Sequence, residues 1–173
     1  SGPNGAIRAW LAALDDVPED HLRGGFTQKT LRQWMRERPG HRSFAVLRHP
    51  VRRLHDAFCR HVLPGAPGAY AELRQVLEKT FKLPLPAEGA PISAEEHRAA
   101  FKAFARFVHG NLSGQTSVRV DGAWASQLAV IQGMAQFAPP DHLLREDELD
   151  VSLLSLAEDA GLPEPPPWTP AGE

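Results

Sequence analysis

The amino-acid sequence predicts an α/β fold in which a small sheet is flanked by helices. In the stretch Ser43–Val62, a short apolar run leads through a proline turn into a helical pattern. Leu143–Arg145 is a second short strand-like segment, and another helical pattern follows it. Apolar residues recur at helical spacing in most of the remaining chain, so we expect helices to outnumber strands.

Length and composition are those of one soluble domain. The chain has 173 residues, of which 42% are apolar and 23% charged. Its formal net charge is −2, so it lacks the bulk positive field of a nucleic-acid-binding protein. Fifteen of the nineteen basic residues are arginine, whose planar guanidinium suits phosphate and sulfate groups.

Cysteine and histidine usage limits the site chemistry. The single Cys59 excludes an internal disulfide and favours a reducing compartment. The eight histidines are scattered and one cysteine cannot build a thiolate zinc site, so we expect no metal. No apolar run approaches the roughly 20 residues that span a bilayer, and we therefore expect a cytoplasmic protein without a membrane span.

The central stretch is predicted to be a strand, a tight turn and a helix. Ser43–Leu47 supplies the buried strand, and Pro50 suits the first position of a helix because its missing N–H would be unpaired there. The helix is expected over Val51–His61, with one apolar face. A helix N-terminus beside Arg48 and Arg52 is a suitable place for a phosphate.

The polar face of this helix is also regular. Arg52, Asp56 and Arg60 are four residues apart and lie along one side. The alternative to a phosphate site is therefore an exposed Arg–Asp–Arg ladder on a buried strand–helix unit.

Further helices follow in chain order, separated by loops rich in glycine and proline. We expect them at Ala6–Leu14, Gln28–Arg38, Ala71–Phe81, Glu95–Val108 and Val151–Asp159. Ser93 is predicted to cap one helix and Asp150 another, and Gly161 is predicted to end the last. The domain is expected over residues 1–163, followed by an extended or loose, proline-rich tail over residues 164–173.

Residues 47–58, LRHPVRRLHDAF, resemble the second nucleotide-binding motif of the sulfotransferase family, in the branch of carbohydrate sulfotransferases and their bacterial relatives. In that motif an arginine and a serine hold the 3′-phosphate of the sulfate donor, 3′-phosphoadenosine-5′-phosphosulfate (PAPS). The resemblance assigns the arginine role to Arg48. Asp56 stands at the serine position, where a carboxylate repels phosphate unless Arg52 and Arg60 neutralise it.

The first donor loop of the family resembles Ser1–Gly5 only in its second half, because the preceding strand and the lysine are absent from this sequence. The resemblance implies that Gly2, Asn4 and Gly5 contact the 5′-phosphosulfate. Two explanations of the missing half are open: an N-terminus that is truncated, or a loop that is degenerate. The alternative to a donor loop is that Ser1-Gly2-Pro3 is a frayed end or one that is not native.

The expected general base is His21, which looks like the histidine of the family in this region, and its unperturbed pKa near neutrality suits the role. The alternative is a surface histidine that follows an acidic turn.

Two later segments also resemble the family. Asp121–Gln127 is similar to an Asp-x-His-Trp-x-x-Gln element on the acceptor side, with Ala123 in place of the histidine. Trp124 would then meet a sugar ring and Gln127 would bond its hydroxyls; a structural tryptophan is the alternative. The strand ending at Glu146, with the later Gly161-Leu162-Pro163, is similar to the last recognisable segment of the family.

The resemblance implies a parallel sheet in a fold like that of nucleotide kinases, with a P-loop-like donor site. It implies transfer of a sulfuryl group from PAPS to a hydroxyl of a carbohydrate or small metabolite, without a metal. Two alternatives remain: a catalytically degenerate domain that binds a nucleotide or a partner, and a helical interaction module whose arginine-rich helix binds an acidic partner.

Overall fold

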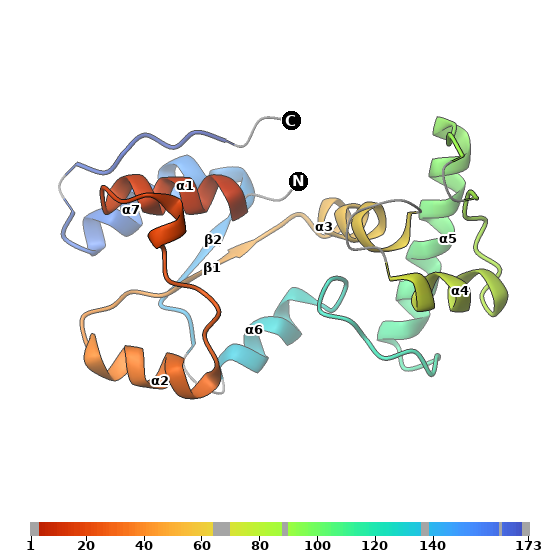
Figure 1. Cartoon of the computed structure of the whole chain (residues 1–173), viewed down its shortest axis with the longest axis horizontal. Coiled ribbons are helices and arrows are strands. Elements are labelled where there is room, and N and C mark those ends of the chain that lie inside the picture. The colour runs from red at the N-terminus through yellow and green to blue at the C-terminus, as the bar shows by residue number, and fades with distance from the viewer. Residues whose placement is uncertain (1–3, 64–69, 88–89, 136–138, 163, 171–173) are drawn as a thin grey trace. The chain divides into compact units, whose positions relative to one another are not determined.

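The computed structural model describes residues 4–63, 70–87, 90–135, 139–162 and 164–170, with the side chains of residues 134 and 135 excepted. The described part of the chain is rich in helices and contains one small sheet (Figure 1). In chain order they are α1 (Asn4–Leu14), α2 (Gln28–Glu37), β1 (Phe44–Leu47), α3 (Pro50–Ala57), α4 (Ala71–Lys79), α5 (Ala94–Leu112), α6 (Gln127–Ala135), β2 (His142–Arg145) and α7 (Leu149–Asp159).

The chain divides into two compact units. Unit 1 comprises Ser1–Arg48 and Ile131–Glu173, and unit 2 comprises His49–Val130. Both α/β character and the small parallel sheet of the predicted fold are present in unit 1. The expectation of one domain over residues 1–163 stays a prediction, because compactness does not establish whether a unit folds alone.

The sheet of unit 1 is a parallel pair. Phe44 lies opposite His142 and Leu47 opposite Arg145. The pair begins at a polar lock that residue patterns did not indicate: the backbone N–H and the hydroxyl of Ser43 both donate to Asp141 Oδ2 at 2.7 Å. The N–H of His142 then donates to the Ser43 carbonyl at 3.0 Å, which sets the register.

Helices α1 and α7 cover one face of this sheet. Their apolar sides meet alternate residues of the strands, because side chains of a strand point to opposite faces in turn. The core of unit 1 consists of Ile7, Trp10, Leu144, Leu149, Leu153, Leu156 and Ala157, with Phe44 and Val46 packed against it. The prediction of a strand here is confirmed over Phe44–Leu47. The prediction that it is buried and central is wrong, because β1 is half-buried along its length and is one of two strands in the described sheet.

The end of α7 follows the predicted glycine stop. Gly161 has φ of +76°, a left-handed conformation that glycine adopts without a Cβ penalty. Leu162 N–H donates to the Ala157 carbonyl and Gly161 N–H to the Glu158 carbonyl, both at 2.9 Å, which is the Schellman arrangement. At the other end the prediction is wrong: α7 starts at Leu149, so Asp150 lies in its first turn and is not the cap.

The C-terminal segment is extended but not loose. Trp10 Nε1 donates to the Pro166 carbonyl at 2.9 Å, and Trp168 packs against the core of unit 1. Of the two expected forms, extended or loose, these residues have the extended one, and they are held in place because the indole N–H of a buried tryptophan needs an acceptor.

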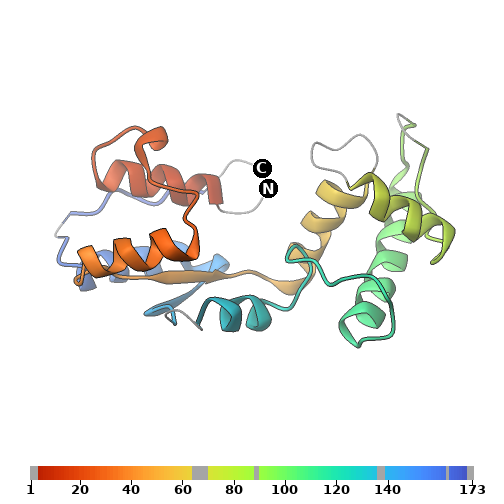
Figure 2. The same ribbon diagram turned by 60° about the horizontal axis from the view of Figure 1, so that its bottom comes forward.

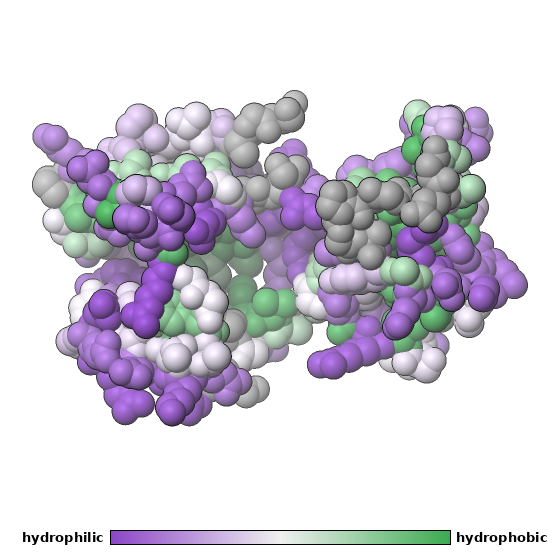
Figure 3. All heavy atoms as spheres, viewed as in Figure 1, coloured by the Kyte–Doolittle hydropathy of each residue, from purple (hydrophilic) through white to green (hydrophobic). Residues whose placement is uncertain are grey.

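Helix α2 begins at Gln28 as predicted and ends at Glu37, one residue before the predicted end; Thr27 is its N-cap, and the Thr27 side chain accepts from the N–H of Thr30. None of its residues is fully buried. Figure 3 shows hydrophilic residues along it, at the lower left. Its apolar residues Leu31, Trp34 and Met35 are half-buried, and the ring of Trp34 contacts both the ring of Phe26 and the guanidinium of Arg38.

Unit 2 has an aromatic core. Phe58 and Phe104 are fully buried, and each contributes about 1.5–3 kcal/mol of stabilisation relative to an exposed side chain. The other core members are Val62, Leu77, Leu83, Ala100, Phe107, Val108 and Trp124. The phenylalanines along α5 belong to this core, since Phe104 and Phe107 are buried and Phe101 packs against them. As predicted, Ser93 caps α5, through reciprocal bonds with Glu96.

The helix that follows β1 changes its hydrogen-bonding pattern along its length. Helix α3 is α-helical to Ala57 and continues as a π-helical turn over Phe58–Val62, where Leu63 N–H donates to the Phe58 carbonyl at 3.0 Å. Helix α6 was not predicted, since its apolar residues show little segregation to one face. Among the described helices, none is both long and apolar enough to cross a membrane.

Candidate functional site

The two parallel strands end beside each other, at an edge that carries one predicted site residue. Arg48 follows β1 and Glu146 follows β2, in continuation of the register that pairs Leu47 with Arg145. In open α/β sheets, ligands bind outside the carboxyl ends of the strands. Arg48 therefore lies at the edge where a ligand of such a sheet is expected.

Arg48 and Glu146 form an ion pair there. The Nε of Arg48 donates to Glu146 Oε1 at 3.2 Å, and the side chains are 16% and 15% exposed. Within the described residues, the second oxygen of Glu146, Oε2, is buried and has no hydrogen-bond partner. A buried acceptor without a donor costs about 1–3 kcal/mol, so this oxygen would gain from a donor group of a ligand.

The first turn of α1 lies at the same end of unit 1 as the carboxyl end of β1 in both views (Figures 1 and 2). Asn4 and Gly5 begin this helix, where the N–H groups have no intrahelical acceptor. Gly2, the third predicted loop residue, lies outside the described residues.

His21 ends a 3-10 turn over Glu19–His21 and is exposed. Its backbone N–H donates to the Pro18 carbonyl at 2.9 Å. The role of His21 as the general base stays a prediction.

Arg52, Asp56 and Arg60 belong to unit 2, where they follow one side of α3 and its π-helical turn. The two arginines are exposed and Asp56 is half-buried. The pKa of the Cys59 thiol is raised, first by burial and then by the negative charge of Asp56. Asp56 therefore lies close enough to Cys59 to act on it electrostatically.

Trp124 is a core residue. It is 4% exposed, its Nε1 donates to Asn111 Oδ1 at 2.9 Å, and its ring meets Phe104 edge-on. The prediction that Trp124 offers an open face to a sugar ring is therefore corrected, because both the ring and its N–H are taken up by packing. Gln127 is half-buried at the start of α6.

Arg53 was not predicted, yet it joins two of the sequence landmarks. From α3 it donates to the carbonyl of Gly122 at 2.6 Å and to that of Ala125 at 2.7 Å. A guanidinium can bridge two carbonyls because its N–H groups form a rigid planar fork. Arg53 thus holds the Asp121–Gln127 turn against the central helix.

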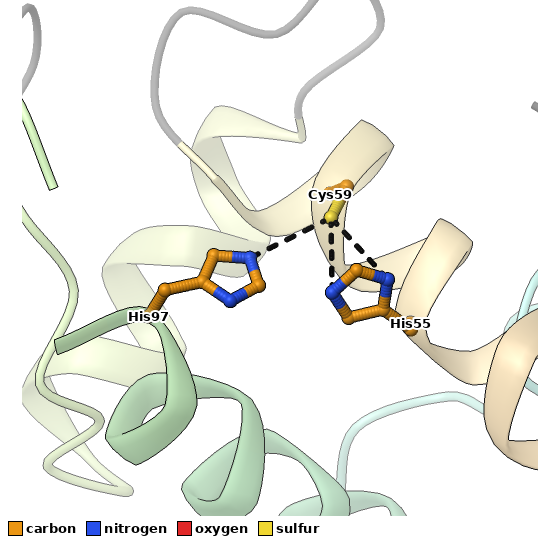
Figure 4. A group of neighbouring side chains, drawn as sticks. All are labelled: His55, Cys59 and His97. Atoms are coloured by element: carbon orange, nitrogen blue, oxygen red, sulfur yellow. Dashed lines mark hydrogen bonds between the residues drawn. The ribbon is translucent and has the colours of Figure 1, made fainter. Parts of the chain in front are cut away.

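A second feature that the sequence analysis missed is a group of His55, Cys59 and His97 (Figure 4). Cys59 Sγ lies 3.7 Å from His55 Nε2 and 3.8 Å from His97 Nε2. The pKa of His97 is lowered, first by burial and then by the charge of His55. The i, i+4 spacing of His55 and Cys59 could have indicated a pair, but no local pattern points to His97 on another helix.

A surface hollow of about 710 Å³ lies between α5 and the segment after α4. Of the described residues that line it, three are basic and none is acidic; the basic ones are Lys82, Lys102 and Arg106. Lys102 and Arg106 are one helical turn apart on α5, so their charges share a face.

Comparison with protein-family models, with curated proteins and with solved structures found no match to this chain.

Proposed function

We propose that this chain is a sulfotransferase-like domain that binds PAPS at the sheet edge of unit 1 and transfers its sulfuryl group to a hydroxyl. The observation that carries the proposal is Arg48 at the carboxyl end of β1, beside a parallel partner strand. That arrangement agrees with the motif order from which the resemblance to sulfotransferases was drawn, and with ligand binding at strand carboxyl ends.

Arg48 anchors the 3′-phosphate in this proposal. A guanidinium has five N–H donors, so its bond to Glu146 through Nε is compatible with an anion at the terminal nitrogens. Glu146 would hold the side chain in place, which reduces the entropy lost when the anion binds.

The reaction is an in-line displacement at sulfur. The hydroxyl oxygen of the acceptor forms the new S–O bond while the S–O bond to the 5′-phosphate of the donor breaks. His21 takes the hydroxyl proton, and the N–H groups at Asn4 and Gly5 bind the phosphosulfate oxygens. Such transfer depends mostly on positioning and charge stabilisation, by analogy with phosphoryl transfer.

A second candidate function, anion binding without catalysis, has two observations in its favour. The hollow lined by Lys82, Lys102 and Arg106 belongs to unit 2, whereas Arg48 belongs to unit 1. Clustered basic groups in a concave surface attract acidic ligands. The Asp at position 56 also fits a domain in which the donor site has degenerated.

Calorimetric titration with 3′-phosphoadenosine-5′-phosphate tests the first candidate. We expect saturable binding, and then transfer of labelled sulfate from PAPS to a panel of carbohydrate and small hydroxyl acceptors. Binding without transfer would favour the degenerate domain. No binding of the nucleotide would overturn the sulfotransferase proposal.

A further inference from the structure

Unit 2 holds three side chains whose donor atoms converge. His55 lies on α3, Cys59 in the π-helical turn that follows, and His97 in the first turns of α5. All the ligand atoms of this group lie within 4.8 Å of one another. Figure 4 shows both imidazole rings facing the sulfur from the two helices.

The distances lie near those of a shared metal ion. They are also within the range of weak hydrogen bonds to sulfur, which include one of 3.9 Å between Cys59 Sγ and His55 Nδ1. A tetrahedral zinc ion with Zn–S of about 2.3 Å and Zn–N of about 2.0–2.1 Å holds sulfur and nitrogen about 3.5 Å apart. The Sγ–Nε2 distances of 3.7 and 3.8 Å are within a few tenths of an ångström of that value. A thiol is also a weak donor and acceptor, so it gains little from two imidazoles alone.

The aromatic core restricts the orientation of the two rings. His55 meets Phe101 edge-on at a centroid distance of 5.0 Å, and His97 meets Phe58 at 5.5 Å. All three ligand residues are half-buried, so an ion can reach them from solvent. The π-helical turn that carries Cys59 is a local geometry found frequently at functional sites.

We propose that His55, Cys59 and His97 bind one Zn²⁺ ion, which ties α3 to α5 and leaves a fourth coordination position for water. One thiolate and two imidazoles form a ligand set suited to zinc, and three protein ligands with an open position are typical of exchangeable or catalytic sites. The negative charge of Asp56 beside Cys59 adds to the attraction of a dication. This site is independent of the sulfotransferase proposal.

Cobalt is the probe for the experiment, because Co²⁺ bound by thiolate has a charge-transfer absorption in the near ultraviolet. Cys59 is the only cysteine of the chain, so that absorption can come from no other sulfur. The reduced full chain is titrated with Co²⁺ and then with Zn²⁺. We expect one Co²⁺ per chain, displacement by Zn²⁺ and a higher melting temperature with Zn²⁺, because a ligand of the folded state stabilises it.

The variants locate the site. We expect Cys59→Ser to abolish the absorption and His97→Ala to weaken cobalt binding by at least about tenfold, the lower end of what even an outer-shell change costs. The control is His109→Ala, which removes an exposed histidine from the last turn of the same helix and should bind like the original chain. Circular dichroism of the metal-free variants checks their folding.

Two further measurements provide the test where His97→Ala does not fold. One is cobalt binding by His55→Gln, and the other is whether Zn²⁺ protects Cys59 of the unchanged chain from an alkylating reagent. Absence of the thiolate absorption, or equal alkylation rates with and without Zn²⁺, would overturn the proposal. Equal cobalt affinity of a folded His97→Ala variant would do the same.

Discussion

Arg48 and Glu146 are 98 residues apart in the chain, yet the Nε of one donates to a carboxylate oxygen of the other at 3.2 Å. Each follows one strand of the parallel pair, so the register of the sheet brings them together. The arginine that sequence motifs single out for phosphate therefore has a carboxylate partner in the folded chain. Its role as an anion ligand depends on whether that partner positions it or neutralises it.

Coupling between the two residues is measurable in a double-mutant cycle. We expect Arg48→Ala and Glu146→Ala each to lower the free energy of unfolding, because each leaves a largely buried charge without this partner. The double variant should lose less than the sum of the two, with a coupling energy of roughly 0.5–3 kcal/mol. Urea unfolding measures all four species; additive effects would show that the pair does not stabilise the fold.

Nucleotide affinity should depend on Arg48. Charge-assisted bonds contribute roughly 1.5–3 kcal/mol, so Arg48→Ala should weaken binding of 3′-phosphoadenosine-5′-phosphate by roughly one to two orders of magnitude. Arg36→Ala removes an exposed arginine of α2 and is the control for loss of one charge. Calorimetry compares the three proteins, and equal affinity in folded Arg48→Ala would remove Arg48 from the donor site.

His21 provides a test that separates chemistry from binding. If it accepts the hydroxyl proton, His21→Ala should lower turnover by roughly two orders of magnitude or more and leave nucleotide affinity unchanged. Steady-state transfer of labelled sulfate measures the first quantity and calorimetry the second. His142→Ala replaces a half-buried histidine of β2 and controls for loss of a ring. Full turnover in His21→Ala would exclude it as the base.

The Ser43–Asp141 lock predicts a pH dependence of stability. The pKa of Asp141 is lowered, first by the hydrogen bond from the Ser43 hydroxyl and next by that from the Ser43 N–H. A carboxylate whose folded pKa lies below its unfolded value of about 3.9 stabilises the fold above that pH, and the contribution is lost as pH falls through the folded pKa.

Asp141→Asn should therefore melt at a lower temperature than the original chain at pH 7, and the difference should shrink as the pH falls below about 4. Thermal melts followed by circular dichroism measure this difference. Asp20→Asn changes an exposed carboxylate by the same one charge and serves as the control. A difference that stays constant from pH 7 to pH 3 would contradict the ionic character of the lock.

Arg53 is predicted to hold the Asp121–Gln127 turn. Arg53→Ala leaves two carbonyls without these donors and should lower the free energy of unfolding by roughly 1–3 kcal/mol. Arg53→Lys should restore little of this loss, since an ammonium lacks the planar fork. Arg52→Ala, at the exposed neighbouring position, should change stability by no more than about 0.5 kcal/mol in the same urea experiment.

Local patterns in the sequence were sufficient for most of the secondary structure. The apolar run before Pro50, the Ser93–Glu96 cap and the glycine after α7 each predict an element that the structure contains. Such features depend on the backbone of a few neighbouring residues, and the periods of helices and strands are visible in one segment at a time. Helix α6 was not predicted because its apolar residues are not confined to one face.

The candidate sites depended on contacts between distant segments. Sequence motifs indicated Arg48 but not its pairing with Glu146, and the sequence analysis expected no metal and singled out none of His55, Cys59 and His97 as ligands. Whether Trp124 is a ligand platform or core was decided by its bond to Asn111 and its contact with Phe104. One sequence determines which elements can form; only their packing, which satisfies many long-range contacts together, decides which side chains meet and which are buried.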